Sequence, residues 1–221
     1  MLDIKKLYEN RFSNKDRQLR LSIWRELYKG YFSKFINHKD IVLDLGAGLG
    51  EFILNCDAEQ RIAVDLNPDT EIILKNTNIR VCRESADKMV SIKNNSIDVC
   101  FVSNFFEHLP SKDVLDRVLL EIFRILKPGG KLLSLQPNYR FSSNLYWDCY
   151  DHHIALSDKS FLEATSVIGF KPLLVIPKFL PLTTKSKLPK NNVFIRGYLM
   201  LPILWKIFGK QFFIINEKPL N

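Results

Sequence analysis

Short, dense apolar segments alternate with polar and helix-forming stretches along most of the chain. The strand-like segments begin at Ile41 and continue with Arg61 to Asp65, Ile79 to Arg83, Ser96 to Ser103, Lys131 to Gln136, Phe170 to Ile176 and Gln211 to Asn216. The fourth, SIDVCFVS, is almost continuously apolar, which is typical of a strand buried on both faces of a parallel sheet. The pattern predicts an α/β fold.

The intervening segments carry helical signals. Asp113 to Leu126 is amphipathic and ends at the turn residues 127–130, and Ser157 caps a helix that runs to Ile168, with Gly169 at its end. Residues 1–40 place aromatic rings along one predicted helical face: Trp24, Tyr28, Tyr31, Phe32 and Phe35. This N-terminal segment is either a lid over a ligand site or a packing element, and the aromatic stripe favours packing.

The stretch from Ile41 to Glu51, IVLDLGAGLGE, is the one around which the rest of the chain is organised. It predicts a buried strand, a glycine turn and a helix that opens at Glu51. The dinucleotide fingerprint G-x-G-x-x-G fails because Glu51 stands where its third glycine belongs, and no Gly-Lys-Ser/Thr of a P-loop follows. The carboxylates of Asp44 and Glu51 favour a ligand that carries positive charge.

Other acidic residues follow the predicted strands. Asp65 ends the second strand, where a carboxylate accepts hydrogen bonds from ribose hydroxyls, although it could instead cap the helix near Pro68. The fourth strand runs into Asn104-Phe105-Phe106-Glu107-His108-Leu109-Pro110, which belongs at the ligand crevice of a doubly wound sheet.

These motifs, together with the segment EIFRILKPGGKLLSLQ (121–136), resemble the class I S-adenosylmethionine-dependent methyltransferases, type 11-like. The resemblance implies a doubly wound, seven-stranded, mostly parallel Rossmann-like sheet with an antiparallel last strand, and S-adenosyl-L-methionine as cofactor. The implied cofactor-binding residues are Asp44, Gly46, Ala47, Gly48, Gly50, Asp65, Leu66, Ala86, Asp87, Ser103, Asn104 and Phe106. Asp87 departs from the commonest pattern, because Ser85 holds the place of the usual acid before Ala86.

The acceptor side is expected after the fifth strand. Pro137 to His153 is a long segment rich in Tyr, Trp, Asn and His, which we interpret as a functional loop. His152 and His153, and after them His108, are the candidate catalytic bases, because an unperturbed imidazole suits proton uptake at neutral pH. The chain has no Asn/Asp-Pro-Pro-Tyr set for exocyclic amines and no cysteine placed to attack a pyrimidine, and we expect no metal.

The insertion from Lys178 to Lys210, between strands six and seven, contains seven Lys and Arg residues and no Asp or Glu. Its second half, Val193 to Phe208, is an apolar helix broken near Pro202. We expect the lysines to attract an anionic or lipid-linked acceptor and the helix to contact a membrane surface or a lipid tail. The alternative is that the helix packs on the domain or on a second subunit.

Length and composition fit a single domain over residues 1–221, with 46% hydrophobic residues. No apolar run reaches the length of a membrane span and the N-terminus lacks a signal-peptide core, so we expect the cytoplasm, with peripheral membrane contact open. We interpret the four cysteines as small core residues.

The segments RFSSNLYWDCYDHH, KFLPLTTKSKLP and RGYLMLPILWKIFGKQF resemble a bacterial methyltransferase subgroup associated with polysaccharide and glycan synthesis genes. The resemblance implies O-methylation of a saccharide, a nucleotide sugar or another small polar acceptor. Two alternatives stay open: an RNA methyltransferase or RNA-binding protein that uses the basic insertion, and a catalytically inactive SAM-binding partner subunit. No RNA-binding module accompanies the insertion, which argues against nucleic acid. The oligomeric state is open.

Overall fold

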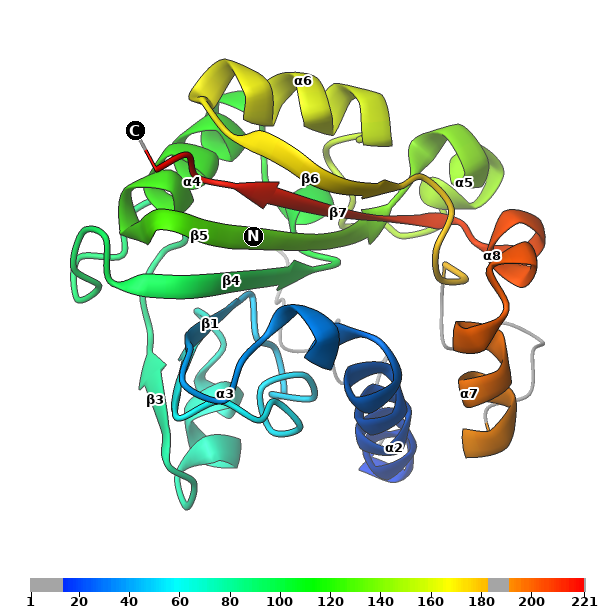
Figure 1. The fold of residues 1–221 in the computed structure, drawn as a ribbon, viewed down its shortest axis with the longest axis horizontal. Coiled ribbons are helices and arrows are strands. Elements are labelled where there is room, and N and C mark those ends of the chain that lie inside the picture. The colour runs from blue at the N-terminus through cyan, green and yellow to red at the C-terminus, as the bar shows by residue number, and fades with distance from the viewer. Residues whose placement is uncertain (1–13, 183–190, 221) are drawn as a thin grey trace.

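A computed structural model describes residues 14–182 and 191–220, and the side chains from residue 17 onward. A seven-stranded sheet forms its centre, in the order β3-β2-β1-β4-β5-β7-β6 (Figure 1). The strands are β1 (Ile41–Leu45), β2 (Gln60–Val64), β3 (Ile79–Cys82), β4 (Ile97–Ser103), β5 (Leu126–Pro137), β6 (Lys171–Ile176) and β7 (Gln211–Glu217).

The strand directions confirm the predicted class of sheet. The strands from β3 to β5 are parallel, whereas β7 pairs antiparallel with both β5 and β6. The strand order reverses between β1 and β4, and a doubly wound sheet binds its ligand at the carboxyl ends of the strands beside such a reversal. The fold therefore places the ligand crevice at the ends of β1 and β4.

Helices cover both faces of the sheet. They are α2 (Asn14–Gly30), η1 (Phe32–Phe35), α3 (Pro68–Leu74), η2 (Phe106–His108), α4 (Lys112–Ile125), α5 (Tyr139–Tyr146), α6 (Asp158–Ile168), α7 (Asn192–Met200) and α8 (Pro202–Phe208). Alternate strand residues enter two separate cores, as period-two patterning requires. Phe212 and Ile214 pack with α4 and α6, whereas Phe213 and Ile215 pack with α2 and α7.

Local capping residues explain several helix limits. Ser157 and Ser160 form a capping box at the start of α6, and Gly169 ends that helix in the left-handed conformation, at φ 110°. Asn191 caps α7, and Pro202 separates it from α8 because proline donates no backbone hydrogen bond. The expected break in the apolar helix is thus confirmed.

The aromatic residues before β1 belong to the core. Tyr28, Tyr31 and Phe32 are buried, and Trp24 and Phe35 pack against them. They share this core with Tyr198 and Leu199 of α7, so the N-terminal helix and the insertion lie side by side (Figure 1). The lysines at 185, 187 and 190, which carry part of the basic insertion, lie outside the described residues.

The prediction of a helix opening at Glu51 is wrong. Residues 51–55 form turns, with one helix-like bond from the Leu54 N–H to the Gly50 carbonyl. Only residues 46–59 connect β1 to β2, and the glycine turn occupies the first of them. The glycine turn takes up residues 46–50, so residues 51–59 alone remain for the return to β2, and residues 51–55 of them form turns.

The interpretation of 137–153 as a loop is wrong in its first half. Asn138 caps α5 by accepting a hydrogen bond from the Arg140 N–H, and its amide nitrogen donates to Asp158 at 2.8 Å. The segment is rich in Ser, Asn and Tyr, whose weak helix propensity hid a helix that tertiary contacts stabilise.

Among the described residues, no helix is long and apolar enough to cross a membrane.

Candidate functional site

The glycine turn after β1 has the geometry that its sequence predicts. Gly46, Gly48 and Gly50 all have positive φ, at 69°, 55° and 79°. A Cβ atom on Gly46 would lie 2.5 Å from the Phe105 ring, so this glycine lets the segment after β4 pack on the turn. A Cβ on Gly48 would meet nothing within 4 Å, so the turn presents its backbone to open space. A ligand therefore has direct access to the backbone of the turn.

Asp65 lies directly after β2 and fixes this turn. One carboxylate oxygen accepts the Gly48 N–H at 2.7 Å and the other accepts the Asn67 N–H at 2.8 Å. Burial raises the pKa of Asp65 above its usual value, against the lowering effect of these hydrogen bonds. The Leu66 N–H is a third backbone donor to this carboxylate, and since a carboxylate offers about four lone-pair positions it retains acceptor capacity. The helix near Pro68 is capped by Asn67 and not by Asp65, so the capping alternative is wrong.

Two further acids stand beside the turn, but they are less exposed than the sequence suggests. Asp44 is almost fully buried, and burial, followed by the charges of Asp65 and Glu51, raises its pKa well above the usual range. Glu51 pairs with Arg20 of α2 at 2.8 Å, and both side chains are mostly buried. The negative charge at the turn is thus smaller than the carboxylate count implies.

The expected adenine end lies on the loops after β2 and β3. Leu66 is exposed and Ala86 is buried. The Asp87 carboxylate accepts hydrogen bonds from Ser85 at 2.5 Å and from Arg117 of α4 at 3.1 Å, and these groups lower its pKa. Asp87 is thus partly engaged by its own fold, which weakens the case for it as an adenine ligand.

The segment after β4 is held tightly in place. Asn104 adopts φ 47°, a left-handed conformation that is uncommon outside glycine and is often found at functional sites. The Phe105 N–H donates to Gln136 at 3.0 Å, and the Gln136 amide donates to the Val102 carbonyl. Ser103, at the end of β4, is half-buried. Phe106 is fully buried and stacks on Phe161, so this predicted cofactor-binding residue lies in the core.

Beyond Phe106, two carboxyl groups flank His108. The His108 Nδ1 atom lies 3.0 Å from the Asp151 carbonyl and 3.2 Å from the Asp151 carboxylate, while its Nε2 atom lies 3.9 Å from Glu107. Burial raises the pKa of Glu107 to about 7. Burial alone would lower the pKa of His108, but the hydrogen bond to Asp151 and the charges of Glu107 and Asp151 outweigh it.

His152 joins this group, whereas His153 does not. The His152 ring contacts His108 with centroids 5.0 Å apart and Tyr146 at 4.6 Å, while the His153 side chain is exposed. The ligand-type atoms of Glu107, His108 and His152 lie within 4.8 Å of one another, an arrangement that could also hold a metal ion. The loops after β4 and β5 therefore bring two of the three predicted histidines together.

Exposed aromatic rings lie in the chain between α5 and these histidines. Trp147 is 52% exposed and Tyr150 is 73% exposed. Trp147 packs edge-on against Tyr139 and Tyr146, which hold its ring in one orientation. An oriented, half-exposed ring is a suitable platform for the apolar face of a polar ligand.

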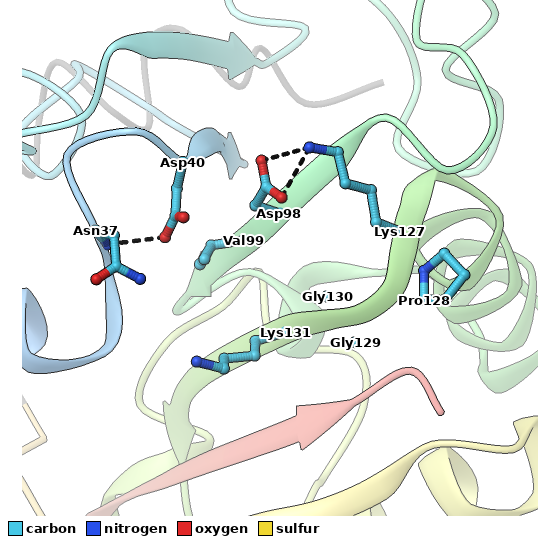
Figure 2. Close-up of a pocket in the computed structure, with 9 residues that line it drawn as sticks. All are labelled: Asn37, Asp40, Asp98, Val99, Lys127, Pro128, Gly129, Gly130 and Lys131. Atoms are coloured by element: carbon cyan, nitrogen blue, oxygen red, sulfur yellow. Dashed lines mark hydrogen bonds and ion pairs between the residues drawn. The ribbon is translucent and has the colours of Figure 1, made fainter. Parts of the chain in front are cut away.

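The cavity shown in Figure 2 lies elsewhere. It has a volume of about 230 Å³ and is lined by residues 37, 40, 98, 99 and 127–131. These residues lie before β1 and in the first parts of β4 and β5, at the amino ends of the strands, whereas the glycine turn lies at the carboxyl end of β1. Asp98 and Lys127 in its wall are paired at 2.8 Å. This cavity does not contribute to the candidate site.

Several site residues could not be identified from the sequence. Gln136 positions the segment after β4, Thr70 donates to the Gly48 carbonyl at 2.6 Å, and Arg20 compensates Glu51. Arg20 lies in the polar continuation of the aromatic stripe of α2, at helical spacing from Trp24, which was a signal that it faces inward. The other contacts depend on tertiary packing.

Comparisons with known proteins agree with this geometry. Residues 43–134 match the family model of a methyltransferase domain. An uncharacterized methyltransferase-like protein of Schizosaccharomyces pombe is 31% identical over 101 residues, which are 44% of this chain and 38% of that protein. The chain thus spans well under half the length of this curated relative.

Solved structures match over nearly the whole chain. A SAM-dependent methyltransferase from Archaeoglobus fulgidus is 22% identical, with a TM-score of 0.71 over 98% of this chain and 100% of its own. A SAM-dependent methyltransferase from Methanosarcina mazei is 18% identical, with a TM-score of 0.65 over 86% of this chain and 97% of its own. The open backbone at Gly48 and the remaining lone pairs of Asp65 fit the cofactor that this fold indicates, S-adenosylmethionine. Residues 43–134 therefore match a methyltransferase domain, and the chain has the fold of the class I, S-adenosylmethionine-dependent methyltransferases.

Proposed function

We propose that this protein transfers a methyl group from S-adenosylmethionine to an oxygen atom of a saccharide, a nucleotide sugar or another small polar acceptor. When bound, the cofactor supplies an electrophilic methyl group on a sulfonium. The residues of this chain then have three tasks, which are to hold the cofactor, to align the acceptor hydroxyl with the methyl group and to take up the hydroxyl proton.

The cofactor side of the proposal rests on the turn after β1. Asp65 is oriented by two backbone N–H groups, so its remaining lone pairs point in fixed directions and suit a pair of ribose hydroxyls. Phe105 packs on Gly46, so the segment after β4 forms one wall beside the turn. Gln136 fixes that wall from the end of β5.

The acceptor side rests on the aromatic rings near the histidines, and this is the observation that carries the proposed acceptor class. Sugar rings have apolar C–H faces and polar edges, which match an exposed indole with polar neighbours. Trp147 offers such a face, and Asp148 and Asn144 beside it are exposed. The similarity of this segment to the polysaccharide-associated subgroup points to the same class of acceptor.

We assign proton uptake to His152. His152 would accept the proton of the acceptor hydroxyl as that oxygen takes the methyl group, while the glycine turn and Asp65 would hold the cofactor, which would supply the methyl group from its sulfonium and be left as a neutral thioether. His108 is the less suitable base, because Asp151 and Glu107 raise its pKa and these two carboxyl groups already engage both of its ring nitrogens. His108 instead holds one side of His152, at a ring distance of 5.0 Å.

A turnover screen tests this function. Purified protein is incubated with methyl-labelled S-adenosylmethionine and a panel of nucleotide sugars and lipid-linked saccharides, and the methylated atom is located by NMR. For the accepted substrate, Trp147→Ala should raise KM about threefold to tenfold without changing the affinity for S-adenosylhomocysteine, since it removes only the stacking face. Leu145→Ala, at an exposed position of α5, is the matched control. Methylation at nitrogen or carbon, or an unchanged KM in Trp147→Ala, would contradict the assignment.

A further inference from the structure

The helices α7 and α8 each have an inner and an outer side. Tyr198 and Leu199 are buried in the core, and Trp205 packs against Phe179 with ring centroids 4.9 Å apart. The outer side consists of large apolar side chains that are largely exposed, which we call the outer face: Val193 (81% exposed), Met200 (79%), Leu201 (51%), Ile203 (60%), Ile207 (62%) and Phe208 (40%). An apolar patch of this kind usually marks an interaction site.

The outer face is displayed by a fixed scaffold. Arg196 of α7 forms an ion pair with Glu26 of α2, with a second contact at 3.1 Å. At the two ends of α7, Ser22 donates to Asn192 at 3.0 Å, and Gly30 lies so close to Leu199 that a Cβ there would be 2.8 Å from its side chain. In Figure 1, α7 and α8 lie at one margin of the molecule, past the end of the sheet.

The surrounding charge is positive. Lys206 is exposed on α8 between Ile203 and Ile207, and Lys178 and Lys210 flank the helix pair. Over the whole segment 178–210 the sequence has seven basic residues and no acidic one, within a chain of net charge +8. A symmetric pairing with a second copy would bring two such segments together, and that repulsion disfavours a dimer through this face.

From this combination we propose that the outer face of α7 and α8 docks on the surface of an anionic lipid membrane. The aliphatic side chains enter the boundary between headgroups and acyl chains, and the basic residues contact the anionic headgroups. The helices are too short to span a bilayer, so the protein lies on the membrane. Phe208 is the single aromatic ring among the six side chains of the outer face, and the other five offer no stacking surface for bases, so a nucleic acid is the poorer match.

Vesicle sedimentation tests the proposal with the full chain. Vesicles of pure phosphatidylcholine are compared with vesicles in which roughly a third of the lipid is phosphatidylglycerol. We expect binding to the anionic vesicles, weaker binding at high salt, and at least a tenfold loss of binding in the double variant Ile203→Ser/Ile207→Ser. The matched control is Ile72→Ser/Val167→Ser, which removes two exposed aliphatic side chains from α3 and α6.

Three results would overturn the proposal. The first is no binding of the wild-type protein to anionic vesicles, a result that needs no variant. The second is equal loss of binding in the test and control variants. The third is a wild-type dimer in analytical ultracentrifugation that the double variant converts to a monomer, because the face would then be an interface between two copies. Vesicle binding is measured without cofactor or acceptor, so its result is independent of the proposed methyl transfer.

Discussion

Buried carboxyl groups are the main residue-scale feature of this protein. Asp44 is buried beside Glu51 and Asp65, and its pKa is raised, so its charged form is unfavourable in the free protein. A cationic ligand group near the turn would reverse that penalty. The fold therefore keeps a destabilising residue at its cofactor turn, as functional sites often do.

Asp44→Asn should stabilise the free protein at neutral pH and weaken the binding of S-adenosylhomocysteine. A carboxyl whose pKa is raised on folding destabilises the folded protein more and more as the pH rises above its unfolded pKa of about 3.9. The stability gained by Asp44→Asn should therefore shrink as the pH falls toward that value. A gain of about 1 kcal/mol would raise Tm by about 2 to 4 °C. Calorimetric unfolding at neutral and acidic pH measures this, and a variant that is less stable at neutral pH would refute the argument.

The histidines near the acceptor side give a second residue-scale prediction. His152→Ala should lower kcat by about 10² or more while leaving the affinity for S-adenosylhomocysteine unchanged, and added imidazole should restore part of the turnover. A purely structural loss would show no rescue by imidazole. His153→Ala is the matched control, because it is the adjacent residue and its side chain is exposed.

Metal removal is the companion experiment for the same residues. Turnover should survive dialysis against EDTA, since the proposed step requires only the imidazole. Glu107, His108 and His152 are close enough to hold an ion, so this outcome is informative. If EDTA abolishes turnover and added zinc restores it, these residues hold a metal ion and His152 is not the base.

The local geometry of candidate site residues was predictable from the sequence where a motif fixes it. The glycines and Asp65 follow directly from strand ends and from backbone geometry, and the positive φ values agree. The placement of His152 inside and His153 outside was not predictable, because adjacent residues of an irregular segment have no period. Arg20 and Gln136 were missed because their partners are distant in the sequence.

At the scale of elements, the pairing of α2 with α7 links the N-terminal segment to the insertion. Glu26 is buried on α2, and the hydrogen bond from Arg196, followed by its charge, keeps the pKa of Glu26 below the usual value despite burial. This contact joins segments that are 170 positions apart in sequence, so no local pattern signals it. The boundaries of α6 and α8 followed from caps and prolines, whereas the predicted turn 127–130 belongs to β5, the predicted loop 137–153 contains α5, and the predicted helix at Glu51 is a set of turns.

Arg196→Ala should destabilise the protein at neutral pH by leaving the Glu26 carboxylate buried without its guanidinium. A carboxyl whose pKa is lowered on folding stabilises the folded protein at pH values above its unfolded pKa of about 4.3. That contribution is lost as the pH falls through the pKa of the folded state. Wild type should therefore lose more stability on acidification than the variant, as urea unfolding at both pH values would show. Lys206→Ala, at an exposed position of α8, is the control. Parallel pH profiles for wild type and Arg196→Ala would contradict this.

At the scale of the whole molecule, the ligand crevice and the outer face lie on related parts of the fold. The crevice opens at the carboxyl ends of β1 and β4. Lys178 links α8 to α5, because it donates to the Lys206 carbonyl and lies 5.2 Å from the Phe141 ring of α5. Docking through α7 and α8 would bring α5 near the membrane surface. A lipid-linked saccharide would then reach the crevice without leaving the bilayer.

The central claim is that the turn after β1 binds S-adenosylmethionine and that Asp65 holds its ribose. Titration calorimetry with S-adenosylhomocysteine tests it most directly, with Asp65→Ala as the variant and Asp116→Ala, an exposed change on α4, as the control. We expect one bound molecule per chain for the wild type and the control, and an affinity about tenfold to a hundredfold weaker for Asp65→Ala, because two hydroxyls lose a charged acceptor. No binding by the wild type, or an unchanged affinity in folded Asp65→Ala, would contradict the account.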